Sequence, residues 1–141
     1  MKRIVVIVSI SLYLLYGCAE RKVKAWKYID VRVSAYNSVP SQTDSRPSIA
    51  AWGDTLKPGM RCIAVSKDLL QLGIDYNTAI KIEGLDSLYW VKDKMHSKWR
   101  KRIDIYMGKD IKKAKDWGVR KLRIYYVSKT DSLAKTVERQ P

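Results

Sequence analysis

Residues 90–108 read WVKDKMHSKWRKRIDIYMG, with two acidic residues inside apolar runs on either side of a cationic loop. Isoleucines flank Asp104 on both sides and Val91 precedes Asp93, an alternation typical of strands that are buried on one face. Aspartate is disfavoured in strands and is costly to bury without partners. We therefore expect each acid either to be capped by hydrogen bonds or to have a chemical role.

The rest of the chain predicts a small all-β domain. Six alternating or apolar runs predict strands, and two polar runs that begin at the N-caps Ser66 and Asp110 and end at Gly73 and Gly118 predict short helices. Many strands with single short helices favour a closed barrel over a layered α/β sheet. The predicted strands are 28–36, 60–65, 78–82, 87–91, 102–106 and 119–127.

A long segment, residues 37–58, interrupts the strands and is rich in Ser, Pro, Thr and Asp, which is loop chemistry. Long loops in small domains are usually functional or disordered. The apolar residues from Ile49 to Trp52 indicate that this loop folds down onto the barrel. Asp44 is its candidate functional acid, although an Asx turn also explains an aspartate there.

The N-terminus has the layout of an export signal, with Lys2 and Arg3 before an apolar run that ends at Gly17. The run Leu15-Tyr16-Gly17-Cys18 resembles the lipobox of bacterial lipoproteins, which implies cleavage and acylation at Cys18; a plain secretory signal or an uncleaved anchor is the alternative. We expect an exported protein of the cell envelope, such as the outer membrane, whose lipid anchor faces the periplasm or the outside. The expected parts are a signal (1–17), a tether (18–27), one domain (28–127) and a mobile tail (128–141).

Charge and composition limit the partners. The net charge is +14, and loss of the signal leaves about +12, so we expect anionic partners such as lipid headgroups or the cell-wall polymer. The predicted export argues against nucleic acid. With Cys18 lipidated, Cys62 has no disulfide partner and is expected to be a buried hydrophobe. His96 is the only histidine and is expected to be exposed, so we predict no metal site. We also expect no cofactor and a monomer.

Several segments together carry a family resemblance. In chain order they are VSAYN (33–37), TDS (43–45), GDTLKPGMRCIAVSKDL (53–69), IEGL (82–85), VKDKM (91–95), RIDIYMG (102–108) and GVRKLRIYYV (118–127). This set resembles the 3D domain, named for three shared aspartates, here Asp44, Asp93 and Asp104. The resemblance implies a six-stranded double-psi β-barrel like the catalytic barrel of membrane-bound lytic transglycosylase A and of stationary-phase muralytic proteins.

The resemblance also implies an activity, cleavage of the peptidoglycan glycan strand between N-acetylmuramic acid and N-acetylglucosamine. It assigns proton donation to Asp104, with Asp93 and Asp44 in the same groove. The chain departs from the family pattern between Asp93 and Asp104, where it has a tryptophan and five Lys or Arg residues but no glycine. This departure concerns substrate specificity and the shape of the groove more than the acid.

Lytic cleavage needs one carboxyl group, first neutral to protonate the glycosidic oxygen and then anionic to accept a proton from the sugar C6 hydroxyl. The pKa of Asp104 must therefore rise, which burial and repulsion by Asp93 could supply. Arg102 and Lys101 oppose this rise unless their side chains point away. A hydrolase that uses both carboxylates is the variant mechanism.

Aromatic and basic residues are the candidates for binding the glycan. Tyr36 and Trp99 are expected to stack on sugars, whereas Trp52 and Trp90 are expected in the core. Lys98 and Arg102 could hold carboxylates of the substrate, although a solvated charged rim explains them equally well. The main alternative to an enzyme is a wall-binding module without activity, and a weaker one is a basic adaptor for anionic polymer or lipid.

Overall fold

The computed structural model describes residues 26–39 and 47–128. The predicted signal and Cys18, almost all of the tether, Asp44 and the tail beyond Ser128 lie outside the described residues. Ser128 itself is buried, so the described fold continues one residue past the predicted end of the domain.

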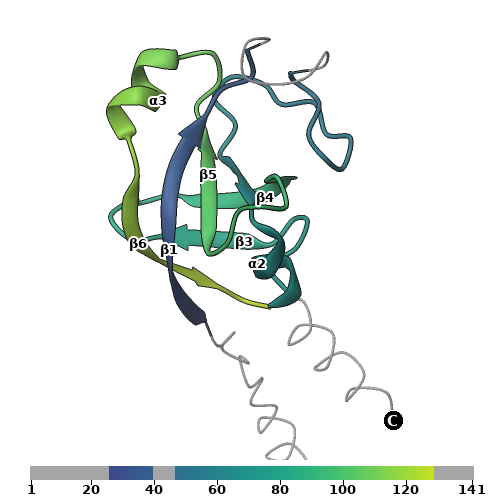
Figure 1. Ribbon diagram of the computed structural model, residues 1–141, viewed down its shortest axis with the longest axis vertical. Helices are drawn as coiled ribbons and strands as arrows, with labels where there is room; N and C mark the ends of the chain where they lie inside the picture. Colours follow the sequence, from purple (N-terminus) through teal and green to yellow (C-terminus); the bar gives the residue numbers. More distant parts are fainter. Residues whose placement is uncertain (1–25, 40–46, 129–141) are drawn as a thin grey trace, which may run out of the picture.

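Within the described residues, six strands form one closed barrel in the order β1-β5-β2-β4-β3-β6, with two short helices outside it (Figure 1). This confirms the predicted all-β barrel with short helices. Strand β4 runs on to Lys94, so the first three residues of the predicted cationic loop belong to the strand. The elements are β1 (Lys27–Tyr36), β2 (Cys62–Val65), α2 (Lys67–Gln71), β3 (Ala79–Ile82), β4 (Leu88–Lys94), β5 (Arg102–Tyr106), α3 (Ile111–Trp117) and β6 (Arg120–Tyr126).

The barrel is a mixed sheet. Strand β1 is parallel to β5 and antiparallel to β6, and β2 is parallel to β4 and antiparallel to β5. Strand β3 closes the barrel with antiparallel pairs to β4 and β6. Parallel neighbours need crossover connections, so residues that are far apart in the chain meet on adjacent strands.

The barrel interior holds the main hydrophobic core, and period-two alternation decides which residues enter it. Ile103 and Ile105 face inward and are buried, and Asp104 between them faces outward. A second, smaller cluster lies on the outer side of β2, where Ala50 and Leu56 of the loop pack against Cys62. The described part of the long loop thus folds down onto the barrel, as predicted.

The predictions for single residues have mixed outcomes. Cys62 is buried, and burial raises its pKa to about 12, so its thiol is neutral. His96 is exposed, as predicted. Trp90, however, is 45% exposed and was wrongly predicted in the core, because its neighbour Val91 takes the inward position on β4. Trp52 is partly buried and packs against the core.

Of the two predicted helix N-caps, one makes the expected side-chain hydrogen bond and the other does not. The Asp110 carboxylate accepts a hydrogen bond from the Lys113 N–H (2.9 Å), as expected of an N-cap. Ser66 makes no such bond, because its hydroxyl donates to Asp68 (2.7 Å) and accepts from the Arg102 N–H (3.1 Å). Ser66 therefore links α2 to the start of β5. Within residues 26–39 and 47–128, no helix has the length and apolar character needed to cross a membrane.

Candidate active site

A row of small and acidic side chains crosses four neighbouring strands on the outer face of the barrel. Ser34 of β1 pairs with Asp104 of β5, and Asp104 pairs with Ala64 of β2. Ala64 pairs in turn with Asp93 of β4. Because paired residues point to the same side of a sheet, the two predicted acids share one face, with Ala64 between them. Asp44 lies outside the described residues.

A β-bulge brings Asp93 to this face. Val91 pairs with Ile63 and Asp93 with Ala64, so Lys92 is the extra residue on β4. Strict alternation would place Asp93 on the same inner side as Val91, which is fully buried. The bulge reverses this and turns the carboxylate outward, a re-aiming of a side chain that bulges often perform next to functional sites.

Asp104 is held by a short hydrogen-bonded chain. The Ser34 hydroxyl donates to its carboxylate, and the Arg102 Nε donates to the Ser34 Oγ at 2.9 Å. The same Arg102 Nε lies 3.7 Å from Asp104 Oδ1, and the Asp104 side chain is only 21% exposed. The carboxyl group is thus mostly desolvated and fixed in orientation, while one edge remains open to solvent.

Burial raises the pKa of Asp104 above its ordinary value, and the hydrogen bond from Ser34 and the charge of Arg102 oppose the rise. The predicted rise is therefore present, and its largest cause is burial rather than repulsion by Asp93. The sequence prediction allowed Arg102 to point away, but residues two apart on a strand share a face, so Arg102 lies beside Asp104.

Asp93 has a structural task. One of its oxygens accepts hydrogen bonds from the N–H groups of Ala51 (2.8 Å) and Lys94 (2.9 Å), which ties the long loop to β4. Asp93 and Asp104 are separated by two strand spacings, or about 10 Å between Cα atoms. A wide separation suits the inverting form of the hydrolase variant, whose carboxyl groups lie about 6.5–9.5 Å apart, better than the retaining form, whose carboxyl groups lie about 5 Å apart.

Tyr36 lies at the end of β1 and is partly buried, whereas a side chain that stacks on a sugar needs one exposed ring face. Its ring packs on Tyr106 with ring centres 5.4 Å apart. Its hydroxyl is buried and lies near the Asp93 carboxylate, although no group in the described residues meets it with full hydrogen-bond geometry. Burial and the negative charge of Asp93 raise its pKa, so the phenol stays neutral and can donate a hydrogen bond.

The other three predicted binding residues form a stack beside Asp104. The guanidinium of Arg102 lies 4.2 Å from the centre of the Trp99 ring, and the Lys98 ammonium lies 5.2 Å from it. This cation–π packing fixes Arg102 next to the acid. Trp99 therefore contacts cations of its own chain, and its predicted contact with a sugar stays a prediction.

Two features of the site are not predictable from local sequence patterns. Ser34 is part of the VSAYN segment, but its contact with Asp104 depends on the parallel pairing of β1 and β5. The second feature is a polar cluster in which Asp54 accepts hydrogen bonds from Lys92 Nζ (3.2 Å) and the Tyr76 hydroxyl (3.2 Å). In the described part of the chain, no three His, Cys, Asp or Glu side chains group as metal ligands.

Comparisons with known proteins add no family assignment. No protein-family model matches the chain, and no curated protein matches it.

The raised pKa of Asp104 predicts how stability depends on pH. The folded state holds this proton more tightly, so the stability that Asp104 contributes is present below its unfolded pKa and is lost as the pH rises through its folded pKa. Asparagine does not titrate, so we expect the unfolding free energy of the wild type, relative to Asp104→Asn, to fall as the pH rises above the ordinary aspartate pKa of 3.8. Urea denaturation measures this difference in unfolding free energy. Asp30 and Asp68, whose pKa values are lowered, make the same pH-dependent contribution to both proteins, so their effects cancel in the difference. A relative stability that rises with pH would contradict the prediction.

Proposed function

We propose that the chain is a peptidoglycan lytic transglycosylase of the 3D-domain type, with Asp104 as its single acid and base. The observation that supports this most is the Asp104 carboxyl group on the outer face of the barrel, largely buried and with a raised pKa. A carboxyl group whose pKa is raised by burial is suited to donate a proton near neutral pH.

In the proposed reaction, neutral Asp104 protonates the glycosidic oxygen between N-acetylmuramic acid and N-acetylglucosamine. The carboxylate that remains then accepts the proton of the C6 hydroxyl as that oxygen closes the 1,6-anhydro ring. Ser34 and Arg102 contact the carboxylate and stabilise this second form, since both favour the charged state. The acid thus returns to neutral as the ring forms.

A wall-binding module without activity is the second candidate. It is favoured by the same contacts, because Ser34 and Arg102 also give Asp104 a purely structural role as a hydrogen-bond and ion-pair partner. Asp93 is likewise engaged with backbone N–H groups of the loop. For either candidate we propose an exported, lipid-anchored monomer that acts on the cell wall.

Mass spectrometry of peptidoglycan incubated with the full-length protein, purified in mild detergent, separates these candidates. Fragments with 1,6-anhydro ends support the transglycosylase. Fragments with reducing ends indicate a hydrolase, and co-sedimentation with peptidoglycan without fragments indicates the binding module.

A further inference from the structure

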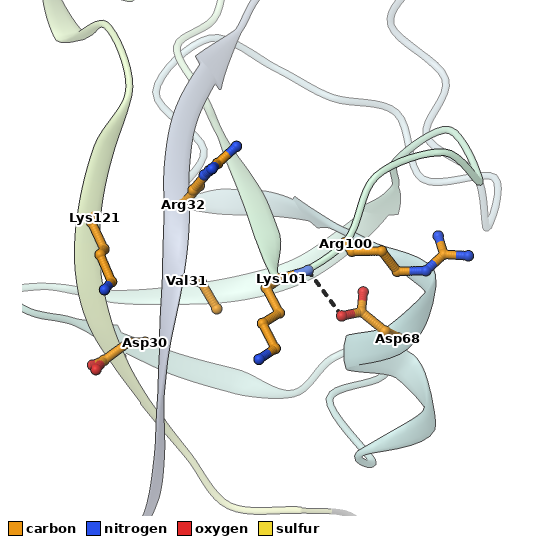
Figure 2. A pocket seen from close by; sticks show the side chains of 7 residues that line it. All are labelled: Asp30, Val31, Arg32, Asp68, Arg100, Lys101 and Lys121. Atoms are coloured by element: carbon orange, nitrogen blue, oxygen red, sulfur yellow. Dashed lines mark hydrogen bonds between the residues drawn. The ribbon is translucent and has the colours of Figure 1, made fainter.

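A hollow of about 630 Å³ lies on the outer face next to the start of β5 and is lined by four cations. They come from three separate segments, with Arg32 on β1, Lys121 on β6, and Arg100 and Lys101 in the loop before β5 (Figure 2). Arg32 is paired in register with both Lys121 and Arg102. Like charges directly opposite each other across strands are destabilising, so an anion bound beside Arg32 and Lys121 would relieve their repulsion.

Two carboxylates, Asp30 and Asp68, also line the hollow, so its four cations leave an excess of two positive charges. Asp30 accepts a hydrogen bond from Arg123 Nε at 3.0 Å, and Arg123 is outside the lining. Asp68 accepts from the Ser66 hydroxyl (2.7 Å) and the Lys101 N–H (2.8 Å). Among the described residues, Arg32, Lys101 and Lys121 form no ion pair, although the charge of Lys121 helps to lower the pKa of Asp30.

The backbone at Lys101 is an independent sign of a built site. Its φ is +45°, in the left-handed region that favours glycine. Two hydrogen bonds hold it there, from its N–H to Asp68 (2.8 Å; dashed in Figure 2) and from the Arg32 N–H to its carbonyl (2.8 Å). A lysine held where glycine would be unstrained leads to the hypothesis that its side chain is needed for function.

We propose that this hollow binds a phosphate group, as a monoester or a diester. An excess of two positive charges around one hollow matches a group that offers several oxygens and up to two negative charges. The planar fork of an arginine such as Arg32 also fits phosphate oxygens in pairs. A single carboxylate would leave more of the positive charge uncompensated, so phosphate is the better match. The site is separate from the chemistry at Asp104 and does not depend on the proposed cleavage.

Calorimetric titration of the full-length protein in mild detergent with inorganic pyrophosphate at low salt tests the site. We expect saturable binding of one pyrophosphate and a loss of affinity of about tenfold or more in the double variant Arg32→Gln/Lys121→Gln. Lys101→Gly is expected to weaken binding and to leave the unfolding temperature unchanged or higher, because glycine relieves the strain. The matched control is Lys57→Gln/Lys109→Gln, which removes two exposed charges elsewhere and should change the affinity less than about twofold.

Several results would overturn the proposal. Pyrophosphate that does not saturate, a control variant that loses as much affinity as the double variant, or equal affinity for tricarballylate, which carries only carboxylates, would each exclude a phosphate site. Two further arms distinguish the source of the phosphate. Binding of a soluble poly(glycerol phosphate) that is lost in the double variant indicates a polymer, whereas binding only of phosphatidylglycerol vesicles indicates a lipid headgroup.

Discussion

Replacing Asp104 with asparagine is expected to lower the rate at which 1,6-anhydro fragments are released from peptidoglycan by about a thousandfold. A positioned general acid and base contributes about 10²–10⁴ to a rate, and asparagine can neither give nor take the proton. Asparagine keeps the shape of the side chain and can still accept the hydrogen bond from Ser34. Quantitative mass spectrometry of the fragments over time measures the effect.

The matched control is Asp86→Asn, which removes a carboxylate from an exposed turn and should change the rate less than about twofold. Thermal unfolding checks that the variant is folded. Because the pKa of Asp104 is raised, its charged form does not stabilise the fold at neutral pH, so the asparagine variant should lose only the contact with Arg102. A folded Asp104→Asn protein that releases fragments at the wild-type rate would exclude Asp104 as the acid.

The second large effect is expected on stability, from Ile103→Ala. Ile103 is fully buried in the barrel, paired in register with Val33 of β1 and Val65 of β2. Truncating a buried isoleucine to alanine removes packed methyl groups and leaves a cavity, which costs about 2–5 kcal/mol. We expect a loss of about 3–4 kcal/mol, a large part of the total stability of about 5–15 kcal/mol of a typical domain. Urea denaturation followed by circular dichroism measures it.

The control for this variant is Ile111→Ala at the start of α3, where the isoleucine is 38% exposed. Alanine also has the better helix propensity, so we expect a change within about 0.5 kcal/mol. Equal losses in the two variants would show that burial in the barrel is not what makes Ile103 important. Because Ile103 precedes Asp104 on β5, the first variant should also misplace the acid and reduce any cleavage.

Parts of the site could be predicted because they depend on local periodicity. Alternation around Asp104 predicted that its isoleucine neighbours face the core, and the N-cap Asp110 predicted the start of α3. The bounds of β5 were predicted to the residue. Where a pattern is set by neighbours within one strand or one turn, the sequence carries enough information to place it.

The predictions that the structure does not support failed because of contacts between distant parts of the chain. Trp90 was expected in the core because it is large and apolar, yet the register of β4 exposes it. Asp93 was expected to tune Asp104, but Ala64 lies between them and the acid instead bonds the long loop. The strand order and the bulge at Lys92 depend on pairing between distant segments. The alternation of apolar residues within one strand therefore does not reveal them.

By itself, the sequence determined that a six-stranded barrel forms and that Asp104 stands out of its core, because apolar periodicity acts over a few residues. Only the tertiary structure decided what surrounds that acid. The parallel pairing of β1 and β5 brings Ser34 to it, and the β4 bulge turns Asp93 onto the same face. The same pairing puts Arg32 among other cations in the hollow of Figure 2. The contacts of Ser34 with Asp104 and Arg102 join residues about 70 positions apart, and crossover connections, rather than any local preference, set them.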